Sequence, residues 1–391
     1  MLEINYSRRE FLKAAGFGAL TLVFPSRARA AQTIHGVTLY VGTYTSGKNK
    51  GEGIYIYRMN PSTGELRHFN TVKGVINPSF LAVDPRKQYL YAVNEIEEFA
   101  GKPSGALSAF SIDQKSGDLR FLNQQSSLGS APCHLIVDVS GKFVLVANYL
   151  GGNVSVLPVQ ADGSLGAATD VAQHQGSGPN SARQQGPHAH CIVLDRSNKY
   201  AFAADLGIDK IMIYEFDAKS GKLRPNKQPW IETTPGAGPR HFSFHPSGKY
   251  AYVINELDST VTAFAYKSGE LTQIQTISTL PKDFSGANTC AEISLSPTGT
   301  FLYGSNRGHD SIVSFAVNQS TGKLTYVENV STGGKSPRSF TIDPAGRFLL
   351  AANQVSNTVV SFRIDSRTGR ITPTGQVADI PTPVCLVLIN A

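Results

Sequence analysis

Short apolar runs alternate with turn-forming residues along most of the chain, and one arrangement recurs. In "PSFLAVDPRKQYLYAVNE" (78–95) an apolar run ends at a turn that starts with Asp, and a second apolar run ends in Asn. The same phrase returns at 132–149, 190–206, 239–256, 290–307 and 337–354. Apolar runs of this length, separated by turn residues, predict β-strands rather than helices.

A third strand follows each copy, as in "GALSAFSI" (105–112), and a turn of the "TG-x-L" type usually leads to a fourth. The copies share an anchor residue at the first turn, which recurs at intervals of about 50 residues: Asp84, Asp138, Asp195, His245, Ser296 and Asp343. Four short strands per repeat, with no helical segment between them, are typical of a β-propeller blade.

The two ends of the chain supply the parts of one more blade. "VTLYVGTY" (37–44) matches the second strand of the repeat without a first, and "TPVCLVLIN" (382–390) matches a first strand with nothing after it. Pairing them would complete the ring and remove an exposed sheet edge. The sequence therefore predicts an all-β fold: a single seven-bladed β-propeller over residues 31–391, closed by pairing of the C-terminal strand with the N-terminal blade.

The first thirty residues have the pattern of an export signal. A twin arginine, Arg8-Arg9, lies in "SRREFLK" (7–13), and a short apolar run and a small-x-small site at 28–30 follow. The run is too short to span a bilayer, so no stable membrane anchor is expected. We interpret residues 1–30 as a twin-arginine signal peptide, read by the twin-arginine export machinery, and expect a periplasmic or secreted protein. The alternative is a basic amphipathic start with no targeting role.

Composition and charge limit the kinds of partner that the protein is expected to bind. The chain of 391 residues has a formal net charge of +7, and no run of Lys or Arg follows the signal segment. A nucleic-acid partner, which would need a concentrated basic face, is therefore not expected, whereas a small anionic ligand suits the mild positive balance. The cysteines lie in apolar strands without metal-type spacing, and buried free thiols are expected although the compartment would allow disulfides: Cys133, Cys191, Cys290 and Cys385.

Polar residues gather where the first strand of a blade starts and where the second ends. In a propeller the first strand lines the central channel and the second runs antiparallel to it, so both positions lie on one face. Asn or Asp recurs at the second position in six blades and indicates a turn role. The other positions vary, and the third to fifth blades, which also carry the long loops 173–190 and 280–292, concentrate the candidates: His188, His190, Arg240, His241, Glu256, Glu292 and Arg307.

Each candidate also has a structural interpretation. His190 could be a core histidine, and Arg240 and Glu256 could be an ion pair without a chemical role. Glu292 would be costly to bury unpaired, so it is expected to face an arginine or channel water. Their shared placement on one rim favours a functional site over these readings.

A metal site at "HAH" (188–190) is a further possibility, with Asp205 as third ligand. Three-ligand sites rarely have two arginines beside them, and no metal or other cofactor is expected. The Gly-rich segments follow no strand-to-helix step, which disfavours a dinucleotide site.

Several motifs resemble one known family. "VGTYT" (41–45), "GPHAH" (186–190), "GPRHFSFHPSGKYAYVINE" (238–256) and "NRGHDSI" (306–312) are similar to the propeller-type 6-phosphogluconolactonases, a family that includes the fungal carboxymuconate cyclases. The resemblance covers essentially the whole chain after the signal segment. It implies a seven-bladed propeller and hydrolysis of a sugar lactone without a metal. The His, two Arg and Glu proposed for the cyclase active site match His190, Arg240, Arg307 and Glu256.

The resulting hypothesis is hydrolysis of an anionic or sugar lactone by a monomer. His190 or Glu256 would activate water, and Arg240 and Arg307 would stabilise the oxyanion or hold an anionic group. Further residues expected to contact the substrate are His134, His188, His241, Glu292 and Asn255. The export signal contrasts with the cytoplasmic phosphogluconolactonases, so the lactone itself stays open. Two alternatives are a carboxymuconate-type cyclase/lyase in the same site and a non-enzymatic exported propeller that acts as a binding module.

Overall fold

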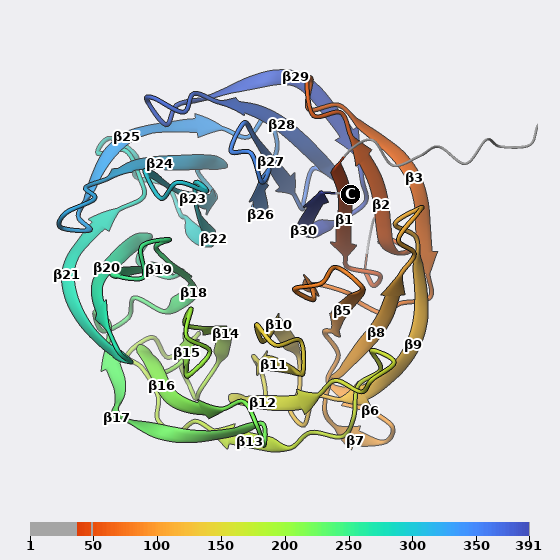
Figure 1. The fold of residues 1–391 in the computed structure, drawn as a ribbon. Helices are drawn as coiled ribbons and strands as arrows, with labels where there is room; N and C mark the ends of the chain where they lie inside the picture. Colours follow the sequence, from red (N-terminus) through yellow and green to blue (C-terminus); the bar gives the residue numbers. More distant parts are fainter. Residues whose placement is uncertain (1–36, 48–49, 391) are drawn as a thin grey trace, which may run out of the picture. The chain divides into compact units, whose positions relative to one another are not determined.

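Seven four-stranded sheets are arranged around one axis in the computed structural model, which describes residues 37–47 and 50–390 (Figure 1). Within these ranges the chain forms strands and turns, and no helix is long and apolar enough to cross a membrane. The predicted all-β fold with seven blades is confirmed. The signal peptide predicted for residues 1–30 lies outside the described part of the chain.

Six blades follow one another along the chain, each from an innermost to an outermost strand. Blade 1 consists of β4 (Leu81–Val83), β5 (Tyr89–Asn94), β8 (Ala106–Ile112) and β9 (Leu119–Ser126), with a small hairpin of β6 (Glu98–Phe99) and β7 (Lys102–Pro103) inserted after β5. Blade 2 consists of β10 (Pro132–Val137), β11 (Phe143–Asn148), β12 (Asn153–Pro158) and β13 (Asp170–Gln173). Blade 3 consists of β14 (Ala189–Leu194), β15 (Tyr200–Asp205), β16 (Lys210–Asp217) and β17 (Lys222–Glu232).

The next three blades have the same plan. Blade 4 consists of β18 (Pro239–Phe244), β19 (Tyr250–Asn255), β20 (Thr260–Lys267) and β21 (Glu270–Ser278). Blade 5 consists of β22 (Thr289–Leu295), β23 (Phe301–Arg307), β24 (Ser311–Val317) and β25 (Leu324–Ser331). Blade 6 consists of β26 (Pro337–Ile342), β27 (Phe348–Asn353), β28 (Thr358–Ile364) and β29 (Ile371–Asp379).

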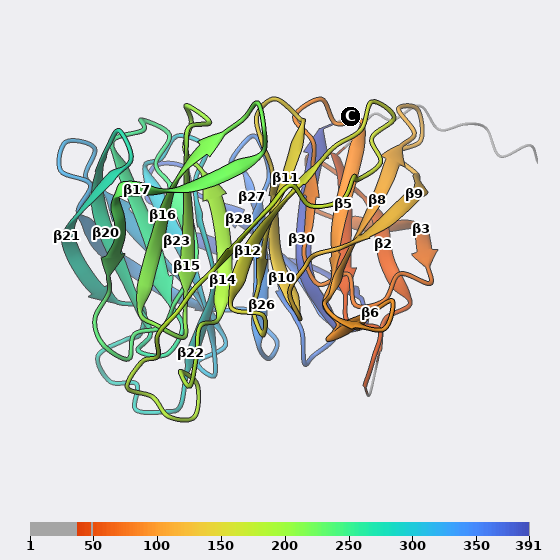
Figure 2. The same cartoon turned by 90° about the horizontal axis from the view of Figure 1, so that it is seen from below.

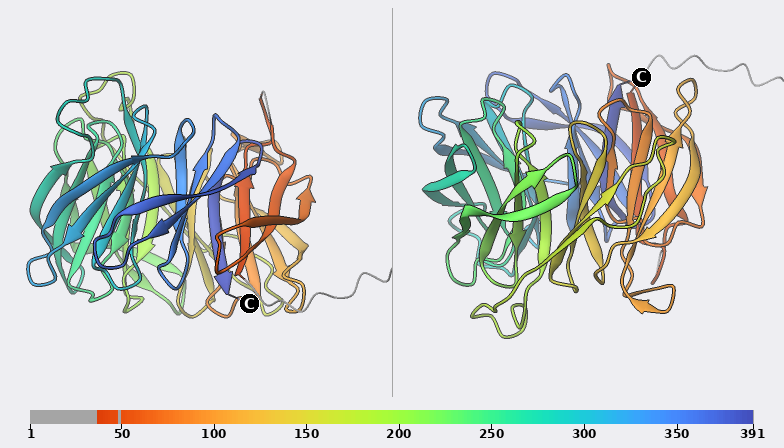
Figure 3. Two further views of the ribbon diagram at one scale, coloured as in Figure 1. Left: turned by 90° about the horizontal axis from the view of Figure 1, so that it is seen from above. Right: turned by 60° about the horizontal axis from the view of Figure 1, so that its bottom comes forward.

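The closing blade joins both ends of the described chain. Its innermost strand is β30 (Pro383–Asn390), followed outward by β1 (Val37–Thr43), β2 (Gly53–Met59) and β3 (Leu66–Lys73). β1 and β30 pair antiparallel, with Val37 opposite Asn390 and Gly42 opposite Cys385, and Figure 3 shows them side by side. The predicted ring closure is therefore confirmed, and it leaves neither strand as an open sheet edge.

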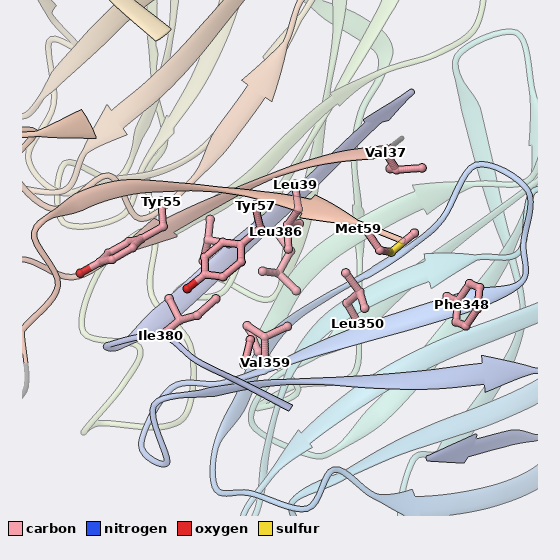
Figure 4. Packing of buried hydrophobic residues seen from close by; sticks show 13 residues of the cluster. Val37, Leu39, Tyr55, Tyr57, Met59, Phe348, Leu350, Val359, Ile380 and Leu386 are labelled. Atoms are coloured by element: carbon pink, nitrogen blue, oxygen red, sulfur yellow. The ribbon is translucent and has the colours of Figure 1, made fainter. Parts of the chain in front are cut away.

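The hydrophobic core lies between blades. Seven clusters of buried residues each join two neighbouring blades. In the cluster drawn in Figure 4, Leu39, Tyr57 and Met59 of the closing blade pack against Leu350 and Val359 of blade 6. Because every blade is covered on both faces, its inner strands are buried on both faces as well. This explains why they read as continuous apolar runs and not as a polar–apolar alternation.

The recurring anchor residues hold the turn between the first and second strands. Asp138 accepts hydrogen bonds through Oδ1 from the N–H groups of Lys142 and Phe143, at 2.7 and 2.9 Å, and through Oδ2 from the N–H of Ser140 at 3.0 Å. Carboxylates at the equivalent positions of other blades accept the same backbone bonds: Asp84, Asp195 and Asp343. The anchors therefore recur because they satisfy turn backbone groups, and they lie away from the candidate site.

A tyrosine hydroxyl links several blades to the next. Tyr252 of blade 4 donates to the carbonyl of Gly322 in blade 5 at 2.9 Å. Matching bonds join Tyr40 to Gly117, Tyr91 to Gly163 and Tyr303 to Gly369. Each of these glycines has a positive φ, which glycine adopts without steric cost. The "TG-x-L" turn seen in the sequence is thus the acceptor of a bond between blades.

Replacing Tyr252 with Phe is expected to lower the free energy of unfolding by about 1–2 kcal/mol. The change removes only the hydroxyl and leaves the buried Gly322 carbonyl without its partner. Denaturant unfolding of the two proteins measures the loss. Tyr326, which is 44% exposed, provides the matched control, and a Tyr326→Phe variant that loses as much stability would contradict this role of Tyr252.

Candidate active site

A β-bulge near the start of the innermost strand recurs from blade to blade. The pairing of β10 with β11, β14 with β15, β18 with β19 and β26 with β27 shifts at one residue each. The residues left without a partner in the ladder are Cys133, His190, Arg240 and Arg338. In β22 the shift spans Ala291 and Glu292. Because a bulge re-aims its side chain, this repeated irregularity brings chemically different residues to equivalent places around the axis.

Glu256, directly after β19, holds three guanidinium groups. Its Oε2 accepts from Arg240 Nε at 2.9 Å and lies 3.0 Å from Arg307 Nη2, while its Oε1 accepts from Arg183 Nη2 at 2.6 Å. We call these four residues the Arg–Glu cluster. Arg240 is 2% exposed and also donates to the Ala291 carbonyl at 2.5 Å. A single carboxylate therefore orients three cations that would otherwise repel one another.

The charges of the Arg–Glu cluster are strongly coupled. Burial by itself would raise the pKa of Glu256, but the guanidinium groups of Arg307 and Arg240 outweigh it and hold the pKa at about 2. Burial lowers the pKa of Arg307 to about 10, with Arg240 adding to the shift. Glu256 is thus a carboxylate and Arg307 a cation near neutral pH, and Arg307 Nε is buried without a hydrogen-bond partner. The cluster keeps donor capacity that the protein does not use.

Three imidazole rings and Phe80 meet beside the Arg–Glu cluster. The centroid of His241 lies 5.3 Å from those of His134 and His190, and 5.8 Å from that of Phe80. We call these four residues the histidine layer. Burial, the largest cause for all three histidines, lowers each pKa well below its usual value, and Arg240 lowers it further. All three are therefore neutral near pH 7, in the form that can accept a proton.

His190 is the member of the histidine layer that Tyr149 links to the Arg–Glu cluster. Its Nδ1 is 3.7 Å from Cys133 Sγ, and its ring contacts Tyr149 edge to face at a centroid distance of 5.4 Å. Tyr149 in turn accepts from Arg183 Nη2 at 3.3 Å and stacks on His188 at 4.5 Å. Tyr149 therefore joins His190, His188 and the Arg–Glu cluster. No hydrogen bond to His190 Nε2 is formed within residues 37–47 and 50–390.

His241 and Glu292 form a pair at the base of this arrangement. His241 Nδ1 lies 2.8 Å from Glu292 Oε1, which also accepts from the N–H of Ile293 at 3.1 Å. His241 Nε2 is buried without a partner. Burial raises the pKa of Glu292 to about 7, although Arg240 opposes the shift. Glu292 was expected to face an arginine or channel water; its hydrogen-bond partner is His241, and Arg240 acts on it through its charge.

Replacing Glu292 with Gln is expected to change how stability depends on pH. The pKa of Glu292 is about 7 in the folded protein against 4.5 ordinarily, so the folded state binds more protons between these values and stability falls as pH rises through them. Gln does not titrate, and the unfolding free energy of the variant relative to wild type should rise by about 1–3 kcal/mol from pH 5 to pH 8. Urea unfolding at four pH values measures this difference. The raised pKa of Glu292 would be contradicted if the difference in unfolding free energy stayed constant with pH. It would also be contradicted if Glu232→Gln, at an exposed position, showed the same change with pH.

Two sequence interpretations do not fit the geometry. Asp205 accepts from the backbone N–H of His188 at 2.7 Å and binds His174 Nδ1 at 2.6 Å, so it does not join His188 and His190 as a metal ligand set. No group of three metal-ligating side chains converges in the described part of the chain. Asn255 is fully buried, and its amide donates to Thr260 and Thr262. We therefore place Asn255 in the turn of blade 4 and not among substrate contacts.

Sequence reasoning missed Arg183. It lies in the long loop between β13 and β14, which protrudes on the same face as the β6–β7 hairpin (Figure 2). Gln184 fixes this loop by donating to the Leu206 carbonyl and to Asp209, both at 2.8 Å. The loop length pointed to the ligand face, but nothing in the sequence linked Arg183 to Glu256 one blade away.

A family model described as "Lactonase, 7-bladed beta-propeller" matches residues 38–388. The chain is 42% identical over 303 residues to a 6-phosphogluconolactonase of Bacillus subtilis (strain 168), an alignment that covers 77% of this chain and 83% of that protein.

Solved structures agree with this similarity. A crystal structure of a protein described as a 6-phosphogluconolactonase of Bacteroides fragilis has 38% identity and a TM-score of 0.84, covering 90% of this chain and 98% of that one. A periplasmic gluconolactonase of Pseudomonas aeruginosa has 35% identity and a TM-score of 0.85, covering 90% and 99%.

Proposed function

The chain belongs to the seven-bladed β-propeller lactonase family, and we propose that it hydrolyses a sugar lactone at the Arg–Glu cluster and the histidine layer. The family and its named relatives make the chain a lactone-hydrolysing enzyme, and not the non-enzymatic binding module considered from the sequence. The observation that carries the proposed mechanism is the contrast between Glu256, which is bound to three guanidinium groups, and the neutral His190, which Tyr149 links to the same cluster.

Arg240 and Arg307 stabilise the negative charge that develops on the carbonyl oxygen. Both guanidinium groups are held in place by Glu256 before substrate arrives, so no reorganisation is needed during the reaction. One preorganised donor of this kind is typically worth about 3 kcal/mol of transition-state stabilisation. Glu256 itself is a poor base, because its pKa is about 2 and both of its oxygens accept charged hydrogen bonds.

His190 activates the water. The Cys133 thiol lies 3.4 Å from the His190 carbonyl oxygen and donates to it, so its sulfur is available to accept from Nδ1–H of His190 at 3.7 Å. This tautomer leaves Nε2 with its lone pair. Nε2 takes a proton as water adds to the ester carbonyl, and returns it to the ring oxygen as the carbon–oxygen bond breaks. The product is a hydroxy acid, and His190 is neutral again.

The reaction is proposed to take place outside the cytoplasm. The twin-arginine pattern in residues 1–30 supports export, and one relative of known structure is described as periplasmic. Fusion of residues 1–30 to a reporter protein that is active only after export tests this part. Export should be lost in an Arg8→Lys, Arg9→Lys variant, and a reporter that is exported equally by both would contradict the assignment.

A panel of lactones tests the reaction. The purified protein should accelerate hydrolysis of glucono-δ-lactone or 6-phosphogluconolactone, followed by acid release at constant pH with the spontaneous rate subtracted. The double variant His190→Ala, Arg240→Ala serves as control and should fall to the spontaneous rate. Equal rates of hydrolysis for the two proteins would contradict the proposal. Turnover of a carboxymuconate with no turnover of any lactone would assign the cyclase/lyase reaction to the same site.

A further inference from the structure

Arg338 reaches the axis from blade 6 but belongs to neither group described above. It is the bulged residue of β26, in the position that His190 occupies in β14 and Arg240 in β18. It contributes to the lowered pKa values of His190, His241 and Arg307, so its charge acts on the same space. Arg338 therefore faces the candidate site from the side of the closing blade.

Within the described residues, the Arg338 guanidinium forms no ion pair or hydrogen bond with a carboxylate. Arg183, Arg240 and Arg307 all pair with Glu256, whereas no ion pair or hydrogen bond to Arg338 is formed among residues 37–47 and 50–390. Its Cζ lies 5.5 Å from the ring centroid of Tyr44, so an aromatic face lies beside the cation. A half-buried guanidinium with all its donors unused is suited to a ligand that supplies the anion.

The surroundings of Arg338 supply an aromatic ring and a nearby carboxylate, neither of which uses its hydrogen-bond donors. The Tyr44 hydroxyl lies 3.0 and 2.9 Å from the two carboxylate oxygens of Glu95, in blade 1. The backbone carbonyl of Tyr44 accepts from the hydroxyl of Thr382 at 2.8 Å. The single hydroxyl hydrogen leaves Glu95 its negative charge: burial would lower the pKa of Arg338, but Tyr44 and Glu95 outweigh it and keep the guanidinium a cation. The tyrosine ring is held beside that cation.

The charges around the axis do not balance. Four guanidinium groups, of Arg183, Arg240, Arg307 and Arg338, face the carboxylates of Glu256 and Glu95. Glu292 is only partly ionised near neutral pH, because its pKa is about 7. The site thus carries a surplus of positive charge, shared between the Arg–Glu cluster, where three guanidinium groups meet one carboxylate, and Arg338, which has no carboxylate within hydrogen-bond distance in the described part of the chain.

We propose that Arg338 binds an anionic substituent of the lactone, a carboxylate or a phosphate, at a subsite separate from the reacting ester. The inference rests on the proposed function, because it places the reacting carbonyl at Arg240 and Arg307 and leaves Arg338 for another part of the same substrate. Tyr44 and Glu95 act as positioning residues for it. Arg338 is then the residue that sets the preference for charged over neutral lactones.

Steady-state kinetics of Arg338→Met and Arg338→Lys test the subsite. The substrates are 6-phosphogluconolactone, which carries a phosphate, glucarolactone, which carries a carboxylate, and the neutral glucono-δ-lactone. In Arg338→Met the ratio of kcat/KM for the preferred charged lactone over the neutral one should fall at least tenfold, chiefly through KM. Arg338→Lys should recover most of this ratio because it restores the charge. The charged lactone with the larger loss identifies the anion.

A control variant and a binding measurement that needs no turnover complete the test of the subsite. Arg67→Met removes the same charge from an exposed position on β3 and should leave the ratio unchanged. Calorimetric binding of 6-phosphogluconate and glucarate should weaken at least tenfold in Arg338→Met, whether or not the protein hydrolyses any lactone. A ratio and a binding constant that stay within twofold of wild type would overturn the inference. Loss of hydrolysis with Arg338-dependent binding intact would contradict the proposed function alone.

Discussion

Glu256→Ala is expected to have the largest effect on folding of any single change at the site, lowering the free energy of unfolding by about 3–5 kcal/mol. The variant leaves Arg240, Arg307 and Arg183 close together without their shared carboxylate. Arg240 is 2% exposed and cannot move its charge into water without disrupting blade 4. Chemical denaturation of the purified variant measures the loss.

The same change is expected to reduce kcat/KM at least about 10³-fold, since both proposed oxyanion donors lose the group that orients them. Glu256→Gln separates charge from shape, because it keeps an acceptor oxygen but not the negative charge. It should fold better than Glu256→Ala and remain strongly impaired in catalysis. A matched control is Glu65→Ala, which removes the partner of the exposed Arg67 and should change stability by less than about 0.5 kcal/mol. A Glu256→Ala protein as stable as this control would contradict the account of the cluster.

The fold could be predicted in detail because each blade repeats the same local sequence features. Apolar runs, an anchor such as Asp138 at the first turn, and a Gly turn that accepts a tyrosine hydroxyl all recur in the sequence. Seven similar inter-blade cores follow from these repeats. The closing blade was predictable for the same reason, since an incomplete repeat at each end implies one shared blade.

The site was only partly predictable because it depends on what differs between blades. The repeat register placed His190, Arg240 and Glu292 at the starts of inner strands, but it could not show the β-bulges that turn them toward the axis. Arg183 came from a loop whose path no local pattern specifies. The pairing of Glu292 with His241 was missed for a similar reason, because it joins neighbouring blades and is set by packing.

The choice between the two candidate bases shows the same limit. The sequence left His190 and Glu256 as equal possibilities, because both are residue types that accept protons. Their surroundings differ: three guanidinium groups hold the pKa of Glu256 at about 2, whereas His190 is buried and uncharged near pH 7, and the proposed mechanism assigns the base to His190 on this ground. Residue type alone does not determine a proton acceptor, because charge and burial set its basicity.

His190→Gln is therefore expected to reduce kcat by about 10²–10⁴-fold while the protein keeps its fold. Gln fills a similar volume and retains polar atoms, but it accepts no proton at neutral pH. The KM should change much less than kcat, because the arginines that hold the substrate are left in place. His309→Gln provides the matched control: His309 hydrogen-bonds Ser311 at the start of β24, outside both groups.

The pH profile identifies the base independently of the loss in rate. Burial and the charge of Arg240 lower the pKa of His190 well below 6.5, so His190 is neutral and competent from about pH 6.5 upward and becomes protonated only in more acidic solution. The wild-type kcat/KM, after subtraction of spontaneous hydrolysis, should be level between pH 6.5 and 8 and decline below this range. An inflection near pH 7 would instead indicate the Glu292 carboxyl, whose pKa is about 7, and would transfer the role of base to its partner His241. Since Glu292→Gln removes that group alone, a decline on the acid side that persists in both proteins supports His190 as the acceptor, because Glu256, with a pKa of about 2, stays ionised there.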